Sequence, residues 1–172
     1  QPVVLDGHES AITSMTFSRD GKRLATTGWD GRVKLWNPSS AVLERSFLAH
    51  RARVHGLDFS HDGTWLATAA ADKTVKLWRL ANEKQPPVVL RGHRDTVRAV
   101  RFMTRPQNYG HTIGVASAGD DGTLRLWRLT PEPTHVGSGL KIKERARIAV
   151  GSAAAALAVS PNGRLLAAAG AD

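Results

Sequence analysis

The feature that most constrains the fold is a unit of just over forty residues that occurs three times along the chain. Each unit opens on a histidine and closes on a tryptophan, and His8, His50 and His93 are spaced 42 and 43 residues apart. A period of this length indicates a repeat architecture, in which each repeat is one supersecondary unit that buries its apolar face against its neighbours.

Within each unit the residue pattern predicts short strands joined by tight turns. In the first unit, apolar residues recur from Ile12 to Phe17 and end at a Ser-Arg-Asp-Gly turn. Three further strands are expected at 23–27, 32–36 and 42–47. The same pattern predicts strands at 54–59, 65–68, 74–78 and 87–90 in the second unit, and at 97–102, 112–117 and 123–127 in the third.

The opening Gly-His, the Asp of the turn before the third strand and the closing Trp resemble the WD40 family, whose repeat is one propeller blade. The resemblance implies an all-β fold, a WD40-type β-propeller that forms a partial ring of four-stranded antiparallel blades. We expect an outer strand of a preceding blade at 1–6, blades at 7–48, 49–91 and 92–143, and an incomplete, degenerate fourth blade at 144–172.

The fourth unit departs from the pattern. Prolines 131 and 133 and the Gly-Ser-Gly run at 137–139 predict a loosened approach to it, and alanines at 153–156 and 167–169 replace larger core residues. The unit also lacks a third strand and a Trp. We therefore expect adjoining blades or a second chain to cover the open faces of this segment.

In the family that the chain resembles, a His, a Ser or Thr, an Asp and a Trp of each blade form one hydrogen-bonded chain. Matching by position gives His8, Thr26, Asp30 and Trp36; His50, Thr68, Asp72 and Trp78; and His93, Ser117, Asp121 and Trp127. His, Ser and Asp together also suggest a hydrolase. Three copies that share a terminal Trp instead predict a structural lock, because a nucleophile is needed only once. We expect no catalytic residues and no enzyme.

Charge is uneven along the chain, which carries a formal net charge of +9. Residues 91–147 hold 11 basic and 5 acidic side chains, and arginines gather where the second and third units begin. In WD40 folds the upper rim binds partners and the first strand lines the channel, so the candidate partner-binding residues are Trp29, Arg51, Arg53, Arg94 and Arg98. The third-strand residues Lys34, Lys76 and Arg125 are expected to form a solvated edge.

Several kinds of site find no support in the sequence. Cysteine is absent, which excludes disulfides and thiolate metal sites and favours a reducing compartment, so we expect a cytoplasmic protein. No Gly-rich phosphate loop and no metal-ligand spacing of the histidines occurs, and no apolar run approaches the length of a membrane span. We expect no cofactor, no metal and no membrane partner.

These observations predict a non-catalytic protein-interaction scaffold or sensor module within a larger protein, with a protein or peptide as its partner. One alternative is the recognition tail of a multidomain signalling enzyme or ATPase. A second is nucleic-acid binding by the basic surface. Nucleic acid is not the partner that we expect, because no stacking aromatic residues are interleaved with the arginines.

Overall fold

The fold consists of short antiparallel sheets that follow one another along the chain. The computed structural model describes residues 4–5, 7–103, 112–134, 137–151 and 153–170. Within these residues every regular element is a β-strand, and each strand pairs with the next one in sequence inside its sheet. None of the described residues forms a helix long and apolar enough to cross a membrane.

Three of the sheets have four strands each, as the repeat predicts. The first sheet contains β1 (Ile12–Phe17), β2 (Leu24–Gly28), β3 (Arg32–Asn37) and β4 (Val42–Leu48). The second contains β5 (Val54–Phe59), β6 (Trp65–Ala70), β7 (Thr74–Arg79) and β8 (Val88–Arg91). The third contains β9 (Val97–Met103), β10 (Ile113–Gly119), β11 (Thr123–Thr134) and β12 (Gly137–Ala149).

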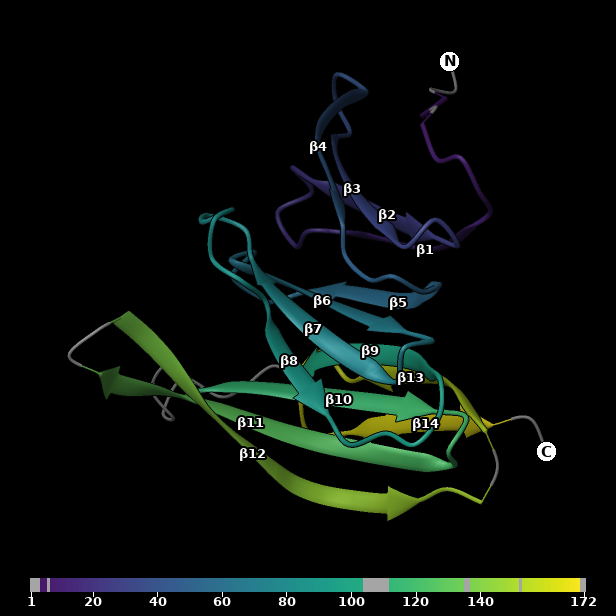
Figure 1. The fold of residues 1–172 in the computed structure, drawn as a ribbon, viewed down its shortest axis with the longest axis vertical. Coiled ribbons are helices and arrows are strands. Elements are labelled where there is room, and N and C mark those ends of the chain that lie inside the picture. Colours follow the sequence, from purple (N-terminus) through teal and green to yellow (C-terminus); the bar gives the residue numbers. More distant parts are fainter. Residues whose placement is uncertain (1–3, 6, 104–111, 135–136, 152, 171–172) are drawn as a thin grey trace.

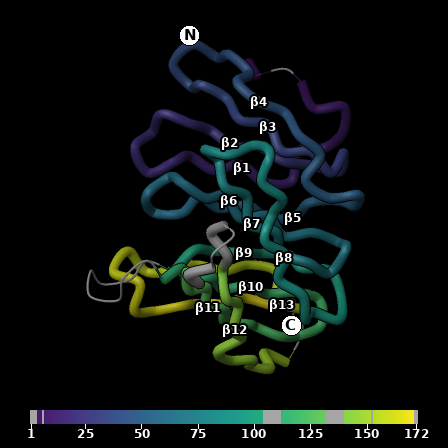
Figure 2. Tube along the Cα trace, turned by 60° about the vertical axis from the view of Figure 1, so that its left-hand side comes forward, coloured from purple at the N-terminus to yellow at the C-terminus, as the bar shows by residue number. Residues whose placement is uncertain are grey.

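The sheets stack in chain order, from the purple first sheet to the yellow last one (Figures 1 and 2). The first strands of successive sheets contact one another, β1 against β5, β5 against β9 and β9 against β13 (Ala154–Val159). This is the arrangement of blades around a propeller axis, with the first strand of each blade innermost.

The core lies between neighbouring sheets. Val33 and Leu35 of the first sheet pack with Leu57 and Leu66 of the second, and a separate cluster joins the second sheet to the third. β2 is buried along its whole length because it lies between β1 and β3, Ala25 packs with the second sheet, and His8 contacts Thr26 on the other side. The repeat therefore buries its apolar residues by stacking on the next repeat.

The third sheet differs from expectation beyond Trp127. The Pro- and Gly-containing segment predicted to loosen the chain instead pairs continuously, from Thr123 opposite Ala149 to Thr134 opposite Gly137. The pairing of β10 with β11 ends at Leu129, so the two prolines lie where β11 has only β12 as a neighbour in the described chain, and an edge tolerates the missing N–H. The third blade accordingly continues to Ala149, past the expected boundary at residue 143.

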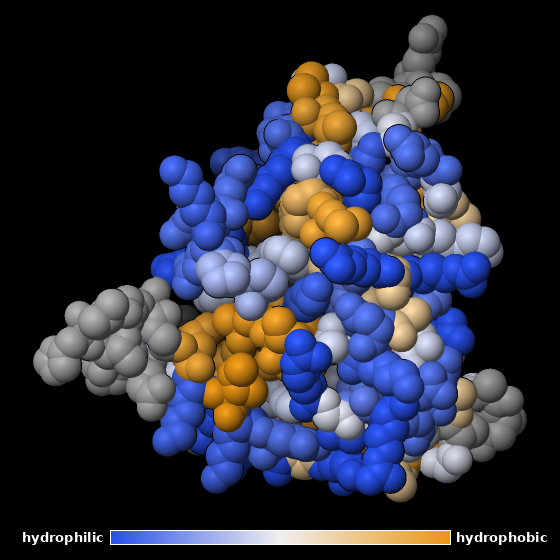
Figure 3. Space-filling view, viewed as in Figure 1, coloured by the Kyte–Doolittle hydropathy of each residue, from blue (hydrophilic) through white to orange (hydrophobic). Residues whose placement is uncertain are grey.

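The two ends of the stack are the least covered parts. The last sheet has only β13 and β14 (Leu166–Gly170), and most of β14 is exposed. At the other end, Met15 and Phe17 of β1 are 63% and 57% exposed. Figure 3 shows separate apolar areas within a mostly polar surface. Val4 and Leu5 lie outside any strand, and the rest of the predicted leading strand lies outside the described residues.

Candidate functional site

The structure brings together the four residues of each repeated set. In all three sets the His Nε2 lies 2.8 Å from the Thr or Ser hydroxyl oxygen. The indole Nε1 of the tryptophan donates to the same oxygen, over 2.9 Å in the first and third sets and 3.0 Å in the second. The His Nδ1 lies 2.7 Å from Asp30 and from Asp72, and 3.0 Å from Asp121.

The chemistry of the end groups fixes the direction of the first and last hydrogen bonds in a set. Indole N–H can only donate and carboxylate can only accept. The hydroxyl therefore accepts from the indole, and the imidazole donates from Nδ1 to the carboxylate. Burial lowers the pKa of His50 and His93, so these two imidazoles are neutral and accept from the hydroxyl at Nε2.

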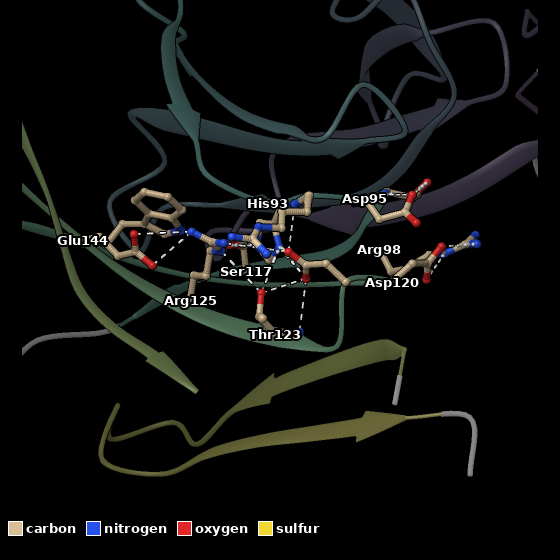
Figure 4. Close-up of polar contacts among 12 residues, drawn as sticks. His93, Asp95, Arg98, Ser117, Asp120, Thr123, Arg125 and Glu144 are labelled. Atoms are coloured by element: carbon tan, nitrogen blue, oxygen red, sulfur yellow. Dashed lines mark hydrogen bonds and ion pairs between the residues drawn. The ribbon is translucent and has the colours of Figure 1, made fainter. Parts of the chain in front are cut away.

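Burial sets the protonation of the third set, which Figure 4 shows around His93 with Ser117 and Thr123 beside the imidazole. Burial lowers the pKa of His93, and the neighbouring Asp121 opposes this only in part. Burial alone would raise the pKa of the Asp121 carboxyl. Hydrogen bonds from the Arg94 N–H, the Thr123 hydroxyl and His93 outweigh it and hold that pKa well below its usual range. The pair is therefore neutral imidazole beside carboxylate at neutral pH.

A basic residue of the third strand also belongs to each buried set, and the prediction of a solvated edge was wrong. Lys34 and Arg125 are 8% and 3% exposed. Lys34 Nζ donates to the carbonyl of Gly7, and Lys76 Nζ donates to that of Ala49 over 2.8 Å. These carbonyls belong to the residues that precede His8 and His50. The signal was available in the sequence, since a Lys or Arg stands two positions before the Trp in all three units.

Arg125 lies in the buried set of His93 and also forms ion pairs with Asp121 and Glu144. Its Nη1 donates to Glu144 over 3.1 Å, which links β11 to β12. A Cβ added at Gly92 would collide with the Arg125 guanidinium. Glycine before the histidine thus leaves room for the third-strand side chain to approach the backbone.

Of the five candidate partner-binding residues, the structure brings Trp29 and Arg53 into direct contact. The Arg53 guanidinium carbon lies 4.1 Å from the centre of the Trp29 ring, within cation–π range. Trp29 remains 49% exposed, and its backbone N–H donates to the Ala11 carbonyl over 3.0 Å. A large aromatic side chain is thus fixed at the surface between the first two sheets. We call this end of the sheets, formed by residues 28–31, 49–53, 92–96 and 119–122, the rim.

The other three candidate arginines, two on the rim and Arg98 next to it on β9, differ in whether they have a partner. Arg51 and Arg94 are exposed. Arg98 donates from Nε and Nη2 to both carboxylate oxygens of Asp120 over 2.7 to 2.9 Å, and these hydrogen bonds to Asp120 raise the pKa of Arg98 (Figure 4). His55 lies near this pair, and burial, then the charge of Arg98, lowers its pKa. Arg98 is therefore committed to Asp120, whereas Arg51 and Arg94 extend the exposed basic surface around Trp29.

No group of three or more His, Asp or Glu side chains that could hold a metal ion occurs in the part of the chain that the structure describes. The notable polar groupings of that part are the three buried sets and the rim.

Stacked antiparallel sheets that each carry the same buried His, Thr or Ser, Asp and Trp define a propeller built from tandem blade repeats. The family model described as "WD domain, G-beta repeat" matches residues 1–37, 41–79 and 84–128, and the chain belongs to this WD40 family.

Curated relatives include MST50-interacting protein 11 of Pyricularia oryzae, 36% identical over 98% of this chain and 49% of its own length. The Ribosome biogenesis protein WDR12 homolog of Drosophila persimilis is 28% identical over 75% of this chain and 23% of its own length. The chain thus spans between about a quarter and a half of these relatives.

Among solved structures, the one titled "Structure of U3-55K" aligns with a TM-score of 0.72 and 21% identity, over 90% of this chain and 44% of that one. "Crystal structure of RRP9 WD40 repeats" aligns with a TM-score of 0.64 and 20% identity, over 79% of this chain and 42% of that one. At these identities the likeness shows the fold, a WD40 propeller.

Proposed function

We propose that the chain is a propeller segment of a non-catalytic protein-interaction scaffold or sensor module, and that it binds a protein partner at the rim. The observation that carries this proposal is the stacked pair of Trp29 and Arg53, in which a tryptophan is held in place and half exposed. Tryptophan and arginine are the residue types that most often dominate binding energy at protein interfaces.

Two further observations support a binding role rather than catalysis. The WD40 family displays variable loops on rigid strands, and one relative is named as an interacting protein. The Ser117 hydroxyl also resembles a catalytic serine, because it contacts His93, which in turn contacts Asp121, but it is fully buried and accepts a hydrogen bond from Trp127. A nucleophile must reach its substrate, and this one is closed off on every side.

The test is to measure partner affinity after changing the rim. A protein captured by the tagged chain is titrated against the wild type and against Trp29→Ala with Arg53→Ala. We expect affinity to fall about thirtyfold or more, the usual loss at an interface hot spot. The matched control is Arg145→Ala, an exposed arginine on β12. Affinity that survives Trp29→Ala together with Arg51→Ala and Arg94→Ala would show that the rim is the wrong surface.

A further inference from the structure

A second candidate site lies at the end of the innermost strands opposite the rim. An open pocket of about 390 Å³ is lined there by residues of β1, β5, β9 and β13 and of the turns that follow them. Phe59, Phe102 and Leu157 form apolar walls, and Arg19 and His61 also line it. We call it the lower pocket. Its volume lies within the range of about 300 to 1,000 Å³ that is usual for ligand sites.

The pocket exists because equivalent positions of the innermost strands carry very different side chains. Asp58 of β5, Arg101 of β9 and Ala158 of β13 each pair with an alanine of the following strand, so they occupy corresponding registers. Ala158 is too short to fill the space in front of the other two. An ion pair between Asp58 and Arg101 is also absent from the described structure.

The carboxylate of the lower pocket is already occupied by the protein. Asp58 Oδ2 accepts the backbone N–H of Phe102 over 2.7 Å, and this bond ties β5 to β9. Burial raises the pKa of the Asp58 carboxyl, because it disfavours the charged form. One oxygen of this carboxylate is therefore used within the protein, between β5 and β9.

The cationic groups, in contrast, retain free donors. Arg101 donates from Nη1 to the carbonyls of Val100 over 2.8 Å and Leu57 over 3.4 Å, and the described contacts leave its Nε and Nη2 without a partner. Arg19 Nη1 lies 2.6 Å from Nδ1 of His61 and donates to it. Arg19 is exposed. Two guanidinium groups with unused donors thus border a pocket that has both apolar and polar walls.

We propose that the lower pocket binds an acidic side chain of a protein partner, with the carboxylate on Arg101 and Arg19 and the aliphatic part against Phe59, Phe102 and Leu157. Arginine forms short, strong, charge-assisted hydrogen bonds with carboxylates, and apolar walls around such a pair limit screening by water. This site goes beyond the function proposed above, since it places a second binding surface on the opposite end of the same sheets.

The test uses two fluorescein-labelled pools of octapeptides and the full chain. One pool is randomised over Asp, Glu, Leu and Phe, and the other over Asn, Gln, Leu and Phe. We expect the acidic pool to bind more tightly, and Arg101→Gln to weaken it about tenfold or more, as the loss of a charged hydrogen bond implies. Ala158→Phe, which fills the pocket without removing charge, should weaken it as much. Arg145→Gln should leave it unchanged.

Three results would overturn the proposal. Equal binding of the two pools would show that the ligand does not need a carboxylate. Full affinity of Arg101→Gln for the acidic pool would show that the peptides bind elsewhere. Competition by inorganic phosphate or a single-stranded oligonucleotide at lower concentrations than the acidic peptides would identify a different ligand. If Arg101→Gln fails to fold in circular dichroism, Arg19→Gln and Ala158→Phe decide the question. Trp29→Ala should leave peptide binding unchanged, which separates this site from the rim.

Discussion

At the scale of single residues, one hydroxyl oxygen holds each buried set together. In the third set the Ser117 hydroxyl accepts from Trp127 and donates to His93, and it is completely buried. The indole of Trp127 joins the third strand of the sheet to the second. The imidazole of His93, which precedes the first strand, contacts Ser117 on the second strand and Asp121 in the turn before the third. Removing the hydroxyl therefore leaves two buried polar atoms without a partner.

We predict that Ser117→Ala destabilises the fold by about 1–3 kcal/mol, because a buried group that loses its hydrogen-bond partner pays its full cost of desolvation. The measurement is urea unfolding followed by tryptophan fluorescence. Ser39→Ala is the matched control, since Ser39 lies exposed in the turn between β3 and β4. Equal urea midpoints for the two variants would show that the buried hydrogen bonds of Ser117 do not contribute to stability as the geometry implies.

The same histidines predict how stability depends on pH. Burial lowers the pKa of His50 and His93, so the unfolded chain binds their protons at a higher pH than the folded chain does. Their contribution to the free energy of unfolding is fully present above pH 6.5, which is about the pKa of histidine in the unfolded chain. It is lost as the pH falls below that pKa. His55 acts in the same direction.

We therefore expect the free energy of unfolding, measured in urea, to fall between pH 7.5 and pH 5. A further loss is expected below about pH 3.8, where Asp30, Asp72 and Asp121 become protonated in the unfolded chain before the folded one. Asp58, whose pKa is raised, opposes that second loss in part. Stability that stays constant or rises from pH 7.5 to pH 5 would contradict the prediction.

At the scale of strands, the sequence predicted the elements of the first two sheets with bounds that differ from the structure by one or two residues. Strands Ile12–Phe17 and Val54–Phe59 match in full, because turn residues mark both ends. The third sheet was less predictable. Pro131 and Pro133 argue against a central strand, and only the sheet order shows that β11 has a free edge at that point.

Side chains that the repeat itself fixes were also more predictable than those that depend on neighbouring sheets. The four residues of each buried set recur at constant positions, and the structure joins them. The pairing of Arg98 with Asp120 and the stacking of Arg53 on Trp29 involve residues that occur in only one repeat. The lower pocket depends on Ala158 facing Asp58 and Arg101, which belong to three different sheets.

At the scale of the whole molecule, each sheet buries its apolar residues against the next, so within the described residues the two end sheets each lack a neighbouring sheet on one side. Ile12 and Met15 of β1 are 46% and 63% exposed, and β14 is exposed along most of its length. Exposed apolar residues that lie together favour association, because burying them releases ordered water. The faces that a propeller would cover with further blades are thus available to another chain.

We predict that the chain on its own self-associates through these faces as its concentration rises. Sedimentation velocity should show an average mass that increases with concentration. Ile12→Lys with Met15→Lys should reduce the association, because two charges on an apolar face oppose its burial. Ser39→Lys with Ser40→Lys adds the same charge at an exposed turn and should leave it unchanged. A compact monomer at every concentration would show that these faces are stable in water without a covering sheet.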